Sequence, residues 1–169
     1  MRVTQGDLWD YRDTHRVVVP VNIGWTQVGE NPMGRGVAKQ AADRFPDLPA
    51  KYGNVCEHYR AVTPVVEFGV IAGRLEVRST LTEPDPITRR GVILFPTKPL
   101  NVDAPHLSWR GPASLELIER GARQLAAGWS QVPVALPLVG CANGRLRDVD
   151  VIPILERYLT GDNFLLVLR

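Results

Sequence analysis

The sequence predicts an α/β fold of three layers, in which a central mixed sheet lies between two layers of helices. Strand-like and helix-like patterns alternate through the second half of the chain, which is typical of a sheet with helices on both faces. An unbroken, largely β-branched run over residues 16–22 indicates a strand that is buried on both faces. At 169 residues, 44% of them hydrophobic, the chain has the length and composition of one globular domain, residues 1–169.

The strands can be justified in chain order. Residues 2–4 are expected to add an edge strand, and residues 16–22 are expected to lie near the centre of the sheet. Five further segments are rich in β-branched and aliphatic residues, at 65–71, 75–79, 92–95, 132–136 and 164–168. Residues 80–90 contain two prolines among polar residues, and they predict a hairpin loop.

Three segments have helical patterns. Residues 33–45 repeat apolar side chains at helical spacing, and the two prolines that follow are expected to end that helix. Residues 112–127 and 149–159 predict two more helices, the first with Pro112 in its opening turn. The side chains of that helix expected to face the core are Leu115, Ile118 and Leu125.

Composition bears on where the protein works and what it binds. The formal net charge of +2 provides no long-range reason for tight, non-specific binding to nucleic acid. No stretch approaches the ~18 apolar residues of a membrane span, and the first residues lack the core of a signal peptide. We therefore expect a cytoplasmic protein with no membrane partner. Cys56 and Cys141 are predicted to be reduced thiols, and neither a metal site nor a cofactor is expected.

Two glycine-rich segments, residues 32–38 and 137–144, each follow an apolar β-like run and precede a helix-like pattern. Such junctions direct unpaired backbone N–H groups and the positive end of a helix dipole outward, and glycine lets the chain approach an anion closely. In open α/β sheets, ligands bind beyond the carboxyl ends of strands. The two segments therefore predict a diphosphate site, to which Lys98 is placed to bring an amine.

With these motifs the chain resembles the macrodomain family, whose members bind ADP-ribose. Five pieces match in order, and they are Gly6-Asp7-Leu8, Val21-Asn22, residues 33–38, Phe95-Pro96-Thr97-Lys98 and residues 137–146. They look most like the branch that contains the DNA-ADP-ribosyl glycohydrolase antitoxins and the related protein ADP-ribosyl glycohydrolases. The resemblance implies a macrodomain-like α/β/α fold and a monomer that binds ADP-ribose or an ADP-ribosylated macromolecule, with DNA among the candidates.

The resemblance also implies residue roles, each with a structural alternative. Asp7, beside Leu8, would accept a hydrogen bond from the adenine amine, or it would cap a turn that begins near Leu8. Asn22 would hold the hydroxyls of the distal ribose, or it would form a turn after the strand. The implied ligand contacts further include Met33, Gly34, Arg35, Gly36, Val37, Thr97, Gly140, Cys141, Ala142, Asn143, Gly144, Arg145 and Leu146.

Lys98 is the residue that the resemblance places at the anomeric carbon of the distal ribose. A lysine amine can act there only if it is neutral or positioned as a proton donor, and burial or a nearby Arg110 or Arg145 would lower its pKa toward that range. The protein-directed relatives carry an aspartate where this chain has Gly144. The catalytic pair Asn22 and Lys98 therefore fits the DNA-directed subgroup better.

Two tryptophans and one substitution complete the candidate site. Trp25 lies in a long loop and is expected either to cover the distal ribose or to anchor the loop. Trp109 follows an insertion over residues 99–108, and it would stack on a base, cover the pocket or pack in the core. Ala142 stands where relatives usually have glycine, and its extra Cβ is tolerated only if the residue keeps a negative φ and the Cβ does not touch the ligand.

The function expected from these residues is an ADP-ribosyl glycohydrolase that removes ADP-ribose from a modified nucleobase or a protein side chain. The alternative is a module that binds ADP-ribose or a related nucleotide without turnover, which the absent aspartate and Ala142 favour. A phosphatase is a minor third candidate, since no nucleophile or metal constellation accompanies the motifs.

Overall fold

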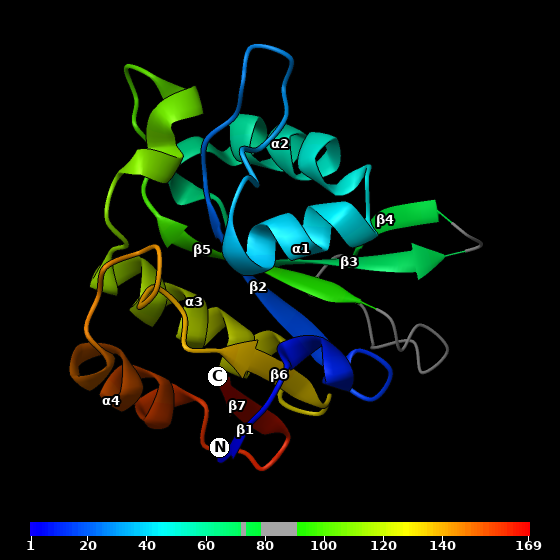
Figure 1. The fold of residues 1–169 in the computed structure, drawn as a ribbon, viewed down its shortest axis with the longest axis vertical. Helices are drawn as coiled ribbons and strands as arrows, with labels where there is room; N and C mark the ends of the chain where they lie inside the picture. The colour runs from blue at the N-terminus through cyan, green and yellow to red at the C-terminus, as the bar shows by residue number, and fades with distance from the viewer. Residues whose placement is uncertain (72–73, 79–90) are drawn as a thin grey trace.

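A computed structural model describes residues 1–71, 74–78 and 91–169, and it has three layers with a mixed sheet in the middle (Figure 1). In the described residues the sheet has seven strands in the order β1-β7-β6-β2-β5-β3-β4. The first five in this order are parallel, and β3 pairs antiparallel with both β5 and β4. The bounds are β1 Arg2–Gln5, β2 Arg16–Asn22, β3 Val66–Ile71, β4 Arg74–Arg78, β5 Val92–Lys98, β6 Val134–Pro137 and β7 Phe164–Leu168.

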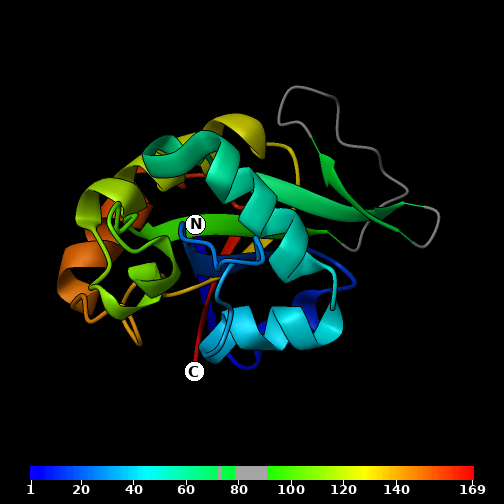
Figure 2. The same cartoon turned by 90° about the horizontal axis from the view of Figure 1, so that it is seen from above.

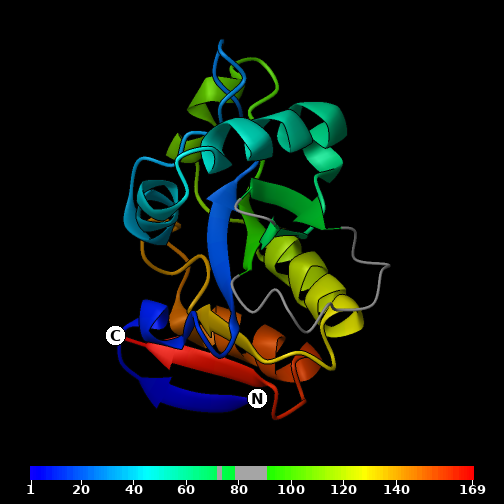
Figure 3. The ribbon, with the colours of Figure 1, turned by 90° about the vertical axis from the view of Figure 1, so that its right-hand side faces the viewer.

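Helices cover both faces of the sheet, as predicted. Figure 3 shows α1 on one side of β2 and α3 on the other. The bounds are α1 Gly36–Arg44, α2 Leu48–Tyr59, α3 Leu115–Gly128 and α4 Asp148–Tyr158, with 3-10 turns η1 Leu8–Tyr11, η2 Arg60–Val62 and η3 Pro105–Arg110. In the described residues, none of these helices is long and apolar enough to cross a membrane.

Strand β2 separates two hydrophobic cores. Val17, Val19 and Val21 pack into the core beneath α1 and α2, whereas Val18 packs into the core beneath α3 and α4. Successive side chains of a strand point to opposite faces, so a strand between two helical layers needs apolar residues at every position. The predicted central, doubly buried strand is confirmed, and the parallel edge strand β1 is also where the sequence predicts it.

The predicted first helix is shorter than expected, and the helix after it was missed. Helix α1 begins at Gly36 rather than Met33, because Arg35 before it is extended at φ −148°. It ends before Pro46, as predicted. Pro49, expected only to end a helix, instead lies in the first turn of α2, where its missing N–H costs no hydrogen bond.

Helix α3 starts later than predicted. Pro112 lies before the helix, and Ser114 is its N-cap, accepting a hydrogen bond from the Leu117 N–H. The later start changes which side chains face the core. Ile118 and Leu125 are buried as predicted, but Leu115 is 39% exposed. The hairpin loop predicted over residues 80–90 and the last residue of the predicted strand 75–79 lie outside the described residues.

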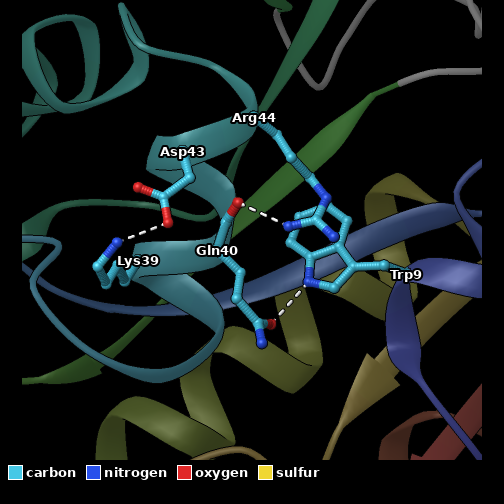
Figure 4. Close-up of polar contacts among 5 residues, drawn as sticks. All are labelled: Trp9, Lys39, Gln40, Asp43 and Arg44. Carbon is cyan, nitrogen blue, oxygen red and sulfur yellow. Dashed lines mark hydrogen bonds and ion pairs between the residues drawn. The ribbon is translucent and has the colours of Figure 1, made fainter.

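Side-chain contacts join η1 to α1 (Figure 4). The Trp9 indole N–H donates to Gln40 Oε1 at 2.8 Å, and the Arg44 guanidinium lies 4.3 Å from the Trp9 ring centroid. Arg44 also donates to the Gln40 carbonyl at 3.0 Å, while Lys39 pairs with Asp43 on the same helix. Together these contacts hold the segment after β1, which carries Asp7, against the helix that follows the first glycine-rich segment.

A buried ion pair lies in the sheet away from the glycine-rich segments. Arg16 Nε donates to Glu67 Oε1 at 2.9 Å, and the Trp129 indole N–H donates to Glu67 Oε2 at 2.7 Å. The three side chains join β2, β3 and the end of α3. Gly91 approaches this carboxylate so closely that an added Cβ would lie 2.4 Å from Oε1.

Candidate functional site

The two glycine-rich segments face each other at the carboxyl ends of the parallel strands. The first follows β2 and opens α1, and the second follows β6. A Cβ built on Gly36 would lie 3.1 Å from Nδ2 of Asn143, so the segments approach to within a side chain's reach. Parallel strands end at one edge of a sheet, which is why loops over a hundred residues apart in sequence meet there.

The second glycine-rich segment presents a row of backbone donors. The N–H groups of Cys141, Ala142, Asn143 and Gly144 donate to no other backbone group among the described residues. The turn is held by bonds from Leu146 N to Gly140 O at 3.0 Å and from Ala113 N to Gly144 O at 2.8 Å. Consecutive free N–H groups in a turn form a concave anion site.

Glycine is required at two positions of this turn. Gly140 has φ +79°, a conformation that other residues rarely adopt. A Cβ on Gly144 would lie 2.3 Å from the Gly140 carbonyl oxygen and 2.7 Å from the Ala113 Cβ. Ala142 is not among the described residues with positive φ, so the first of the two conditions on its extra Cβ is met, and the absence of a contact between that Cβ and the ligand stays a prediction.

The first segment contributes the N-terminus of α1. Gly36 has φ +58°, and the opening N–H groups of a helix lack partners within it. These groups and the positive end of the helix dipole face the second segment, since Gly36 approaches Asn143 there. Gly34 has open space around it, since a Cβ there would meet nothing within 4 Å.

Lys98 lies at the end of β5, directly opposite Asn22 of β2. A register shift after Val21 produces this pairing, and shifts of this kind at strand ends redirect side chains. Lys98 Nζ donates to the Trp109 carbonyl at 2.7 Å. Partial burial and the positive charges of Arg145 and Arg35 lower the pKa of the Lys98 amine.

Cations gather around Lys98 and the exposed ring of Trp109. The guanidinium carbons of Arg35 and Arg110 lie 5.9 and 5.2 Å from the Trp109 ring centroid. The side-chain ion pairs found among the described residues involve none of Lys98, Arg35, Arg110 and Arg145. The two glycine-rich segments, an amine and an unpaired cationic rim therefore form one site.

Comparisons with known proteins agree with this geometry. No family model matches the sequence. A curated relative from Thermus aquaticus, named DNA ADP-ribosyl glycohydrolase, is 33% identical over 119 residues, which is 68% of this chain and 27% of the relative. The solved macrodomain of Thermus aquaticus DarG is 26% identical, with a TM-score of 0.67 over 99% of this chain and 95% of that one. The chain is a macrodomain.

A further solved structure, Thermosipho africanus DarTG in complex with ADP-ribose, shares the fold of this macrodomain at 22% identity. Its TM-score is 0.71 over 99% of this chain and 41% of that one. The present chain thus spans about a quarter of the length of the curated relative and less than half of this structure, so both are longer than the macrodomain itself.

Asn22 of the macrodomain has its amide occupied within the protein. Nδ2 donates to the Pro32 carbonyl at 2.9 Å, and Oδ1 accepts from Gly24 N at 2.9 Å. The side chain is buried and closes the loop that leads to Gly34. The structural alternative for Asn22 is therefore observed, while its contact with ribose remains a prediction.

Asp7 likewise has a structural role in the macrodomain. Its Oδ1 accepts from the Trp9 N–H at 2.9 Å and so caps η1. The other carboxylate oxygen has no hydrogen-bond partner among the described residues, so the cap leaves it available for the predicted bond to adenine. Leu8, Met33 and Thr97 are buried, and Thr97 Oγ1 donates to the Val21 carbonyl at 3.1 Å. These three residues support the walls of the site.

Trp25 anchors its loop to the body of the protein. Its side chain packs against the core beneath α1 and α2, and the Arg60 guanidinium carbon lies 5.5 Å from its ring centroid. Gly53 of α2 and Gly24 both lie so close to neighbouring backbone that an added Cβ would clash. The anchoring contact expected as one alternative for Trp25 is therefore observed, while a place over the distal ribose remains a prediction. Trp109, by contrast, lies beside Lys98 with 37% of its surface exposed.

Sequence reasoning missed Asn31, which holds the same loop. Its Nδ2 donates to the carbonyls of Asn22 at 2.9 Å and Gly24 at 2.8 Å, and its side chain is buried. An asparagine in a stretch rich in Gly, Thr and Pro reads as an ordinary turn residue. Only the folded loop shows that its amide bridges the two ends of the turn.

Proposed function

We propose that this macrodomain binds ADP-ribose and hydrolyses the glycosidic bond between the distal ribose and a macromolecular acceptor. The observation that carries the proposal is the convergence of two backbone anion cradles with the amine of Lys98. The diphosphate would lie between Gly36 and the turn at Cys141–Gly144, with adenine near Asp7. The name of the curated relative, which covers 68% of this chain, supports the same activity.

In this proposal Lys98 acts as the base. The reaction breaks the bond between C1 of the ribose and the acceptor, and it adds the oxygen of water to C1. Positive charge builds on the sugar as the acceptor leaves with the bonding electrons. A neutral Lys98 amine takes the proton of water, and the resulting ammonium returns a proton to the acceptor. The lowered pKa of Lys98 increases the neutral fraction that this role requires.

Asn22 would assist by sharing its amide between the loop and a ribose hydroxyl. The carboxylate that protein-directed relatives use is absent, since Gly144 stands at that position and a larger residue would clash with Gly140. Lys98 therefore carries the proton transfers in this proposal. The acceptor is a nucleobase or a protein side chain.

Two measurements test the proposal. Calorimetric titration should show ADP-ribose binding, and release of ADP-ribose should be measured from ADP-ribosylated oligonucleotide and protein. Lys98→Ala should abolish release yet retain most of the affinity, because the cradle is made of backbone donors. Lys51→Ala on α2 is the matched control. An absence of heat with ADP-ribose would refute the proposal, and unchanged release by Lys98→Ala would remove this residue from the mechanism.

A second candidate is binding without turnover. Two observations favour it: the Asn22 amide is occupied by the loop, and Lys98 Nζ already donates to the Trp109 carbonyl. A protein of this kind would bind ADP-ribose and release none from any modified acceptor. Single-turnover reactions with the protein in excess over the modified substrate separate it from a slow enzyme.

A further inference from the structure

A groove lies beside Lys98, outside the diphosphate cradle. It has a volume of about 460 Å³ and is lined by Pro99, Leu100, Asn101, Leu107, Ser108, Arg110 and Gly111. All of these residues belong to the insertion after β5 or to the turn that closes it. No residue of either glycine-rich segment lines the groove, so it is a separate space next to the same amine.

Hydrogen bonds within the insertion hold the shape of the groove. Ser108 Oγ donates to the Pro105 carbonyl at 2.8 Å and accepts from Asn101 N at 2.9 Å. Asn101 Oδ1 accepts from Ala104 N at 3.1 Å. Gly24 packs directly on this turn, where a Cβ would lie 2.6 Å from Ser108 Oγ. The insertion is thus attached to the Trp25 loop, at the same end of the molecule as α2 (Figure 1), which is the end that faces the viewer in Figure 2.

The lining combines apolar surface with one exposed cation. Pro99, Leu100 and Leu107 provide apolar side chains, and Arg110 is exposed beside the Trp109 ring. A nucleotide has the matching chemistry, because its base offers a flat apolar face and its phosphate carries a negative charge. The volume lies within the ~300–1,000 Å³ of small-molecule sites.

The charge of the rim favours a nucleotide over a peptide. The backbone donors of the cradle would serve the two charges of a diphosphate, whereas Arg35, Arg110 and Arg145 have no carboxylate partner among the described residues. Three cations close together on a surface repel one another unless an anion joins them. A phosphodiester backbone supplies anions in a row, and most peptide segments do not.

We propose that this groove binds a nucleotide of the ADP-ribosylated acceptor, with its base against Leu100 and Leu107 and its phosphate at Arg110. This rests on the proposed function, because it assigns the acceptor side of the same site. The insertion is then the element that contacts the acceptor nucleotide.

Arg110→Gln and Leu107→Glu test the assignment. Arg12→Gln, at the C-terminal end of η1, is the matched control because Arg12 does not line the groove. The three variants and the parent protein are compared in thermal unfolding, in titrations with ADP-ribose, and in titrations with an unmodified single-stranded oligonucleotide. Release of ADP-ribose from an ADP-ribosylated oligonucleotide and from an ADP-ribosylated peptide is measured in parallel.

Both groove variants should lose roughly tenfold or more in oligonucleotide affinity and in kcat/KM for the modified oligonucleotide. Their ADP-ribose affinity should stay within about twofold of the parent, and Arg110→Gln should also reduce the salt dependence of oligonucleotide binding. Unchanged oligonucleotide binding and turnover, or a loss confined to the peptide substrate, would overturn the groove assignment alone. Failure of the parent protein to bind ADP-ribose would instead overturn the proposed function.

Discussion

Gly144→Ala is the substitution whose cost can be worked out most directly from the structure. The new Cβ would lie 2.3 Å from the Gly140 carbonyl oxygen, and such contacts are essentially never below 3.0 Å, so this carbonyl must move by about 0.7 Å. The Ala113 Cβ, at 2.7 Å, obstructs the opposite side. Because the nearest atom belongs to the backbone, rotating a side chain cannot relieve the clash, and the backbone of the turn has to move.

Two hydrogen bonds depend on the atoms that move. Gly140 O accepts from Leu146 N, and Gly144 O accepts from Ala113 N. Overpacking costs ~1–3 kcal/mol and each of the two weakened bonds ~0.5–1.5 kcal/mol, which gives a loss of roughly 2–6 kcal/mol in the free energy of unfolding. For a chain of this size, in which each kcal/mol shifts the midpoint of thermal unfolding by about 2–4 °C, that midpoint should fall by roughly 4–24 °C.

Gly34→Ala is the control for this experiment. Its Cβ meets nothing within 4 Å, so the free energy of unfolding should change by less than ~0.5 kcal/mol. ADP-ribose affinity, measured by calorimetry, should fall in both variants, because each adds a methyl group to a wall of the cradle. Equal thermal midpoints for Gly144→Ala and Gly34→Ala would show that the second turn is not packed as described.

Three further predictions concern the amine, the buried ion pair and the loop. The rate of ADP-ribose release should rise with pH around a midpoint below the ~10.4 of an ordinary lysine, and Arg145→Gln should move that midpoint upward, since removing a positive neighbour raises the pKa of Lys98; a pH–rate profile that does not move would contradict this. Glu67→Gln should cost about 3–5 kcal/mol in urea unfolding, because it leaves the buried charge of Arg16 without its partner, and a variant as stable as the parent would show that the pair is not buried. Asn31→Ala should lower the free energy of unfolding by about 2–5 kcal/mol and weaken ADP-ribose binding, since two buried carbonyls lose their donor. Unchanged ADP-ribose affinity would show that the loop does not support the cradle.

Local sequence patterns were sufficient to predict an element where a single physical requirement determined its environment. The β-branched run of β2 has a single stable environment, between two apolar layers, and its central place in the sheet is confirmed. The prolines near residue 47 show the limit of such reasoning. A proline ends one helix and suits the first turn of the next equally well, and the choice at Pro49 depends on Leu48 and Tyr52 reaching the core.

In the candidate site, too, some features follow from the sequence and others depend on tertiary contacts. That Gly36 and Gly144 lie at strand ends follows from the sequence, but the pairing of Asn22 with Lys98 depends on a register shift after Val21. Trp25 had two alternatives of equal standing, and only the folded protein shows its contacts with Arg60 and the core. Such outcomes depend on which distant side chain arrives nearby, and no local pattern records that.

The sequence by itself determined the strands, the helices other than α2 and the two glycine-rich segments of this macrodomain, because glycine positions and strand composition act locally. Only the tertiary structure decided that the two turns face each other, that the side chains of Asn22 and Asp7 form hydrogen bonds within the protein, and that the insertion after Lys98 lines a groove. Those features arise from contacts between residues far apart in the chain, whose free energy depends on the packing of the whole sheet and its two helical layers.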